Sequence, residues 1–265
     1  MPDKNAKPLG SIAVDLGYTS QEQVEEALKE QRSRQSSGKN RVFIGNLMQE
    51  MGALTPEQLF RVLSKSGDLG APISEDAIRL AGRIKSDCKP EGTVITVTSA
   101  ARGEGVTTVA SQLATAMALM IEGAILLVDA NIPKPSIHEK FGIERSPGFT
   151  DVIEGHFTLG QAVKRTEIPG LWVLPSGGFI DDFLIMLMND TCTQILNDMR
   201  DMGFQYIIID TPPILGHSEA ALISARSDGA ILVVRADKRR KSEVIEMKRV
   251  LDGFKVNILG SLLRK

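Results

Sequence analysis

The sequence predicts a mostly parallel α/β sheet with helices on both faces, preceded by a small all-α domain built from two repeats. From residue 93 onward, near-continuous apolar runs alternate with helical stretches, the pattern of a parallel sheet that is covered on both sides. Before that point, residues 9–28 return in altered form as residues 44–63. A chain of 265 residues, 42% of them hydrophobic, is long enough to bury a core of ordinary size and a smaller one.

The repeat reads "LGSIAVDLGYTSQEQVEEAL" in its first copy and "IGNLMQEMGALTPEQLFRVL" in its second. In each copy a short apolar-periodic helix ends at a glycine, Gly17 or Gly52, that can adopt a positive φ. Ser20 and Thr55 then act as N-caps, each with a Gln three residues later that closes a capping box. Because short amphipathic helix pairs bury little surface alone, we expect the two copies to pack on each other.

These patterns divide the chain into a helical domain at 1–66, a linker with a junction helix at 67–92, and a larger domain at 93–265. The expected strands of the larger domain are "TVITVTS", "AILLVDA", "LWVLPS", "YIIID", "AILVV" and "KVNILGSLL". Its clearest expected helices are 107–120, 183–199, 217–225 and 241–252. Open sheets of this kind bind ligands outside the carboxyl ends of their strands.

Composition narrows the classes of function. The net charge of −2 argues against nucleic-acid binding, which usually needs a basic excess. No stretch approaches the ~20 apolar residues of a membrane span, and the N-terminus has no apolar signal-peptide region, so we expect a cytoplasmic protein. Cys88 and Cys192 have no partners at metal-ligand spacing, which predicts two reduced thiols.

One loop follows the first strand and opens a helix. It reads "SAARGEGVTT" (99–108), close to the phosphate-binding pattern G-x-x-x-x-G-K-S/T, in which backbone N–H groups cradle phosphates and the Lys reaches their oxygens. Gly105 and Thr107 occupy the expected positions, but Val106 stands where the pattern has Lys.

Two acidic residues end other apolar strands. Asp129 follows "AILLV", and Asp210 follows "YIII". A Thr hydroxyl with nearby carboxylates suits a phosphate-bound Mg²⁺, which takes few protein oxygens and keeps several waters. Thr107, Asp129 and Asp210 are therefore the predicted metal residues.

Residues 93–264 resemble the cytoplasmic domain of the bacterial tyrosine kinases (BY-kinases) that control capsule and exopolysaccharide synthesis, a branch of the partitioning-type P-loop ATPases. "ILLVDANIPKPSIHEKFGI" is similar to the second Walker-like motif of that family, and "FQYIIIDTPPIL" is similar to its Walker B motif. "SPGFTDVIEGHFTLGQAVKRTEIPGLWVLPSGG" follows its central segment. The resemblance implies a P-loop NTPase fold for almost the whole larger domain.

The resemblance also implies roles for individual residues. Asp129 would activate the attacking hydroxyl near the metal, and Asp210 would be the Walker B acid that acts on the metal's coordination shell. The residues implied around ATP or ADP are Arg102, Gly103, Glu104, Gly105, Val106, Thr107, Thr108 and Pro212.

The departures from the family pattern concern catalysis. Val106 replaces the Walker Lys, Arg102 replaces a Pro, and Asn131 replaces the second Asp of a D-x-D motif. The only tyrosines, Tyr18 and Tyr206, form no C-terminal cluster. A charge-assisted hydrogen bond contributes roughly 1.5–3 kcal/mol, so losing the Lys weakens both nucleotide binding and phosphoryl transfer. We expect weak or absent kinase activity, with residual binding of Mg²⁺ and nucleotide.

The repeated region resembles the N-terminal domain of type II secretion and type IV pilus assembly ATPases, in which two tandem copies bind cyclic di-GMP in some members. "LG", "G", the spaced apolar residues and Gln31 match the first copy. Pro8 and Phe43 stand where each copy of that motif begins with Arg. A helical protein-docking module and a cyclic di-GMP receptor both remain open.

Three functions follow. The first is a nucleotide-binding pseudo-ATPase or pseudokinase that regulates exopolysaccharide or capsule synthesis and export. The second is an active ATP-dependent tyrosine autokinase of the same pathway, and the third is a cyclic di-GMP-responsive module on a degenerate P-loop scaffold. The resemblance implies a membrane-anchored polysaccharide co-polymerase as partner, recruitment to the inner face of the cytoplasmic membrane, and a homo-oligomer.

Overall fold

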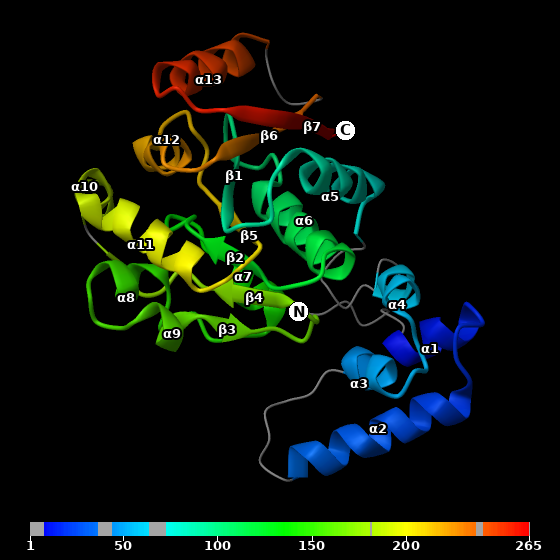
Figure 1. Cartoon of the computed structure of the whole chain (residues 1–265). Coiled ribbons are helices and arrows are strands. Elements are labelled where there is room, and N and C mark those ends of the chain that lie inside the picture. The colour runs from blue at the N-terminus through cyan, green and yellow to red at the C-terminus, as the bar shows by residue number, and fades with distance from the viewer. Residues whose placement is uncertain (1–7, 37–43, 64–72, 181, 237–240, 265) are drawn as a thin grey trace.

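The computed structural model describes residues 8–36, 44–63, 73–180, 182–236 and 241–264, and within them seven strands form one sheet in the order β3-β4-β2-β5-β1-β6-β7 (Figure 1). Every pairing is parallel except that of β3 with β4. The strands are β1 (Thr93–Ser99), β2 (Ile125–Asp129), β3 (Lys164–Arg165), β4 (Leu171–Leu174), β5 (Tyr206–Asp210), β6 (Gly229–Arg235) and β7 (Ile258–Arg264). The mixed α/β fold with a mostly parallel sheet is the predicted one.

Helices cover both faces of the sheet (Figure 1). Two of them cover one face, α5 (Glu75–Asp87) and α6 (Val106–Met120). The other face carries α8 (Phe149–Ile153), α9 (Leu159–Ala162), α10 (Phe183–Met188), α11 (Asp190–Asp201), α12 (Ser218–Ala225) and α13 (Lys241–Gly253). A short helix, α7 (Ile137–Phe141), follows β2.

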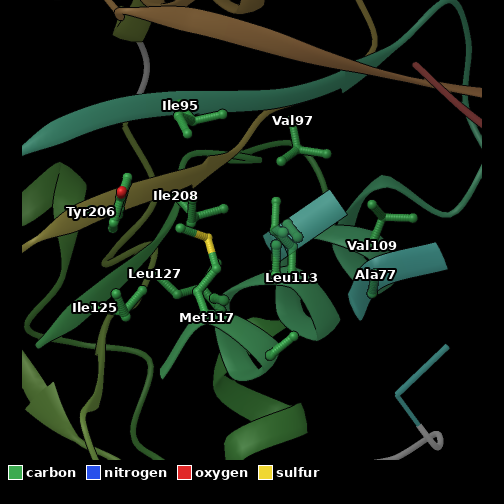
Figure 2. Packing of buried hydrophobic residues seen from close by; sticks show 14 of the residues in the cluster. Ala77, Ile95, Val97, Val109, Leu113, Met117, Ile125, Leu127, Tyr206 and Ile208 are labelled. Atoms are coloured by element: carbon green, nitrogen blue, oxygen red, sulfur yellow. The ribbon is translucent and has the colours of Figure 1, made fainter. Parts of the chain in front are cut away.

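Alternate residues of each central strand point to opposite faces, which is why the strands read as continuous apolar runs. In β2, Ile125 and Leu127 pack into the core under α6, whereas Leu126 and Val128 pack into the core on the other face. Figure 2 shows the first core, where Leu113 of α6 approaches the sheet side chains.

The N-terminal repeats form α1 (Leu9–Asp15), α2 (Gln21–Ser36), α3 (Ile44–Glu50) and α4 (Pro56–Leu63). Both predicted capping boxes are present: Gln23 N donates to Ser20 Oγ (3.2 Å), and Gln58 N donates to Thr55 Oγ1 (3.2 Å), with the return bonds from the cap N–H groups. Gly17 and Gly52 each have a φ of 70°. Apolar residues of the two copies share one buried cluster, as predicted.

The N-terminal helices contact the larger core. Helix α4 lies against α6, and Leu119 near the end of α6 packs against the apolar cluster of the repeats. Helix α5 packs along α6 and contributes Ala77, Ala81 and Ile84 to the core under the sheet. The predicted boundary at residue 66 falls within 64–72, outside the described residues.

Two features differ from the sequence-based expectation. The helix expected at 183–199 is two helices, because Asn189 adopts an extended backbone (φ −78°, ψ 167°) and serves as the cap between α10 and α11. The Asn189 side chain makes no capping hydrogen bond, so the break rests on its extended backbone. Strand β3 was not expected at all, since two residues are too short to show a period of two.

Replacing Leu113 with Ala tests the core under α6. Leu113 is fully buried, so the lost burial and the cavity left behind should lower the free energy of unfolding by about 2–5 kcal/mol. Ile245→Ala on α13, whose side chain is 43% exposed, is the matched control and should change it by less than about 0.5 kcal/mol. Urea unfolding measures both, and equal costs for the two variants would contradict this placement of the core.

Candidate functional site

The loop that joins β1 to α6 lies at the carboxyl end of β1, an interior strand of the sheet. Gly103 and Gly105 have φ values of 83° and 86°, a left-handed conformation that only glycine adopts with little strain. Val109 N donates to Gly105 O (3.0 Å), which starts the helix directly after the turn. The first N–H groups of α6 therefore have no partner within the helix, and such an end attracts anions.

Glu104 braces this loop from within. Its side chain is buried, and Oε2 accepts a hydrogen bond from Ala101 N (3.0 Å) while Oε1 accepts one from Arg235 N (3.4 Å) at the end of β6. The carboxylate thus ties the loop to itself and to the neighbouring strand. The predicted contact of Glu104 with nucleotide stays a prediction.

Val106 places an apolar side chain where the phosphate-binding pattern has Lys. The isopropyl group is 7% exposed and belongs to the core under the sheet. Position 106 therefore supplies packing and a backbone N–H, but no positive charge.

Asp129 and Asp210 lie side by side at the ends of two paired strands. The parallel register of β2 and β5 pairs these two residues directly, and Ala130 N donates to Asp210 O (2.9 Å). Asp129 Oδ1 accepts from Asn131 N (3.2 Å), and Oδ2 accepts from the N–H groups of Ser136 (3.1 Å) and Ile137 (3.0 Å). Neither carboxylate oxygen of Asp210 has a hydrogen-bond partner among the described residues.

The environment of this pair favours its protonated form. Burial raises the pKa of Asp129 from 3.8 to about 6, although its three backbone N–H donors act in the opposite direction. Burial raises the pKa of Asp210 well above 3.8, and the negative charge of Asp129 raises it further. The Thr107 hydroxyl lies close enough to lower the pKa of Asp210, but it does not reach hydrogen-bond geometry with either oxygen.

A cavity of about 280 Å³ opens above the loop. This volume is close to the lower end of the range of about 300–1,000 Å³ that is usual for small-molecule sites. The predicted residues that line it are Arg102, Gly103, Glu104, Gly105, Val106, Thr107, Thr108 and Pro212. Asp129 and Asp210 are buried and do not line it.

Sequence reasoning missed Lys134 and His217 on the walls of this cavity. Lys134 lies in the turn after β2, where its N–H donates to Asn131 O (2.9 Å). His217 follows β5, and its Nε2 is 3.3 Å from Nη2 of Arg102. Their place shortly after two strand ends, beyond Asp129 and Asp210, is the signal that could have identified them.

The donor set fits a phosphate-bound Mg²⁺. Within the described part of the chain, no group of three or more His, Cys, Asp or Glu side chains is arranged to hold a metal alone. Mg²⁺ needs only one or two carboxylates when phosphate oxygens and waters complete its shell. The buried, unpartnered carboxylate of Asp210 beside Thr107 is the kind of site that such a cation would satisfy.

Asp210→Asn should raise the free energy of unfolding of the metal-free protein at pH 7 by about 1–3 kcal/mol, because it removes a buried carboxyl group whose ionised form has no partner among the described residues. The raised pKa means that the folded protein holds protons that the unfolded chain loses above about pH 4. Wild-type stability therefore falls as the pH rises, and the gain from the substitution should be smaller at pH 4.5 than at pH 7.

Urea unfolding at both pH values measures this difference. Asp252→Asn, an exposed carboxylate on α13, is the matched control and should show little change at either pH. A destabilised Asp210→Asn at pH 7 would show that the carboxylate is satisfied in the folded protein.

The chain is similar to several known tyrosine-protein kinases. No family model matches it. The tyrosine-protein kinase YwqD of Bacillus subtilis is 30% identical over 169 residues, which cover 64% of this chain and 70% of YwqD. The tyrosine-protein kinase CpsD of Streptococcus agalactiae is 30% identical over 176 residues, covering 66% of this chain and 76% of CpsD. EpsB of Ralstonia solanacearum is 28% identical, and the match spans only 22% of its length.

Solved structures agree with these relatives. The VpsO kinase domain is 31% identical with a TM-score of 0.66, covering 72% of this chain and 93% of that domain. The chimerical protein CapA2B2 is 27% identical with a TM-score of 0.67, covering 79% and 98%. The cell-division ATPase MinD of Pyrococcus furiosus, 24% identical with a TM-score of 0.55 over 65% of this chain and 71% of its own, shares the fold. With its phosphate-loop geometry and these relatives, the chain belongs to the bacterial tyrosine-protein kinase family.

Proposed function

We propose that the protein is a nucleotide-binding pseudo-ATPase or pseudokinase that regulates bacterial exopolysaccharide or capsule synthesis and export. The observation that carries this proposal is a phosphate loop shaped by two left-handed glycines that has an apolar side chain at its lysine position. Gly103 and Gly105 shape the loop, while Val106 is turned into the core. The site keeps the backbone N–H groups that bind phosphate, but it lacks the lysine charge that would assist phosphoryl transfer.

The chain's own groups would hold Mg²⁺-ATP or Mg²⁺-ADP in a defined way. Backbone N–H groups from Gly103 to Thr108 would face the phosphates, and the Thr107 hydroxyl with Asp210 would meet the cation directly or through water. Asp129 already accepts three backbone hydrogen bonds, so its carboxylate is held in one orientation beside Asp210. When bound, Mg²⁺ supplies the positive charge that neutralises phosphate oxygens and raises the fraction of ionised Asp210.

Phosphoryl transfer depends mostly on positioning and on charge stabilisation in the transition state. A missing Lys removes a charge-assisted contact whose loss reduces the rate about tenfold for each 1.4 kcal/mol. The catalytic roles proposed for Asp129 and Asp210 would therefore operate in a site that lacks one positive charge beside the phosphoryl group. We propose slow or absent transfer with nucleotide binding retained.

An active tyrosine autokinase is the second candidate, and membership of the family favours it equally. Arg102 and Lys134 line the same cavity and could contribute positive charge to it. The cyclic di-GMP hypothesis receives no support from the comparisons and stays a prediction. Pro8 is exposed just before α1, and Phe43 lies outside the described residues.

We further propose the domain division at 1–66, 67–92 and 93–265, a membrane-anchored co-polymerase as partner, and recruitment to the inner face of the cytoplasmic membrane. The relationship to the bacterial tyrosine-protein kinases supports both the co-polymerase partner and a homo-oligomer. Among the described residues, no helix combines the length and the apolar character needed to cross a membrane.

Titration calorimetry with Mg²⁺-ADP and Mg²⁺-ATP tests this function on the wild-type chain and on Val106→Lys. We expect the wild type to bind both nucleotides and Val106→Lys to bind them at least about tenfold more tightly, the value of one charge-assisted hydrogen bond. Release of phosphate from ATP by the wild type should stay at the level of a Thr107→Ala variant.

Two outcomes would contradict the proposal. Turnover of ATP by the wild type, abolished in Asp210→Asn, would establish the active kinase instead. Failure of both the wild type and Val106→Lys to bind any nucleotide would show that the loop no longer serves as a phosphate site. A parallel titration with cyclic di-GMP tests the third hypothesis independently.

A further inference from the structure

The guanidinium of Arg264 lies against the phosphate loop. A Cβ placed on Gly105 would overlap Nη1 of Arg264 and would lie 3.1 Å from its Cζ. Gly105 is the last residue before α6, so the positively charged group sits beside the N-terminal end of that helix. This contact joins the final strand to the loop across a large distance in sequence.

The sheet holds Arg264 in this place. Strand β7 pairs with β6 in parallel, with Arg264 opposite Arg235, and Ala236 N donates to Arg264 O (2.9 Å). Because β6 also pairs in parallel with β1, the carboxyl end of β7 lies at the same edge of the sheet as the loop. The backbone of Arg264 is therefore fixed, and its long side chain reaches Gly105 from a rigid base.

Among the residues that the structure describes, Arg264 makes no side-chain hydrogen bond or ion pair, whereas Arg102 contacts His217. An arginine side chain carries five N–H donors and stays protonated at every physiological pH. Donors held beside a phosphate loop without a protein acceptor are available to an anionic ligand.

Arg264 lines a second cavity. It measures about 320 Å³ and lies between the N-terminal end of α5, helix α6 and β7. Ser74, Asp76, Val109, Gln112, Leu262, Leu263 and Arg264 line it. Arg264 lines this second cavity, and its guanidinium reaches the loop at Gly105, a residue that lines the first cavity.

We propose that Arg264 donates charge-assisted hydrogen bonds to the phosphates of the bound nucleotide and thereby supplies the positive charge that Val106 leaves out. The positive charge comes from a guanidinium on β7 instead of from a lysine in the loop itself. This inference rests on the proposed nucleotide binding and identifies the residue on which the retained affinity depends.

Calorimetric titration with Mg²⁺-ADP tests the inference on Arg264→Gln, which keeps the length and polarity of the side chain but removes its charge. We expect its affinity to fall at least about tenfold, and Arg264→Lys to recover part of the loss. Arg249→Gln, an exposed arginine of α13, is the matched control and should change the affinity less than twofold. Thermal unfolding of each variant confirms that it is folded.

A double variant separates this role from a purely structural one. If Arg264 and a lysine at position 106 serve the same phosphates, Arg264→Gln should cost less affinity in a Val106→Lys background than in the wild type. An equally large loss of Mg²⁺-ADP affinity in that background would overturn the proposal that Arg264 compensates for the missing lysine.

The failures of the two proposals are distinct. Normal Mg²⁺-ADP binding by Arg264→Gln overturns the inference and leaves the proposed nucleotide site intact. A tenfold loss in Lys134→Gln without one in Arg264→Gln would also overturn it, because the compensating cation would then lie after β2. Absence of binding by the wild type and by Val106→Lys overturns the proposed function and the inference together.

Discussion

The parallel pairing of β2, β5, β1 and β6 is the constraint on which the rest of the structure depends. Because these strands run in one direction, their carboxyl ends meet at a single edge. That edge receives the phosphate loop after β1 and the two acids that end β2 and β5. Residues separated by more than a hundred positions in sequence become neighbours there without any direct attraction between them.

The same pairing creates an electrostatic conflict. The register sets Asp129 opposite Asp210, and burial deprives both carboxylates of water. Asp129 is compensated by three backbone donors, but Asp210 has no comparable partner among the described residues. A fold selected for stability alone would not keep two acids in this arrangement, and such conflicts are typical of functional sites.

Local signals in the sequence predicted much of the architecture, because apolar runs and capping residues report directly on nearby backbone. The Ser20 and Thr55 capping boxes and the central strands were found in this way. The break at Asn189 was missed because the apolar pattern continues across it, and β3 was missed because it is too short. Arg264 could not be placed on the loop from sequence, since its contact with Gly105 depends on the order of strands in the sheet.

Helix α6 carries different structures at its two ends. Its first residue follows the phosphate loop, while Leu119 near its last turn is packed into the apolar cluster of the N-terminal repeats, beside α4. With 15 residues and a rise of about 1.5 Å each, it is a rod of about 22 Å. The repeats and the phosphate loop therefore lie at opposite ends of one helix, so a partner bound to the repeats would contact the element that follows the phosphate loop.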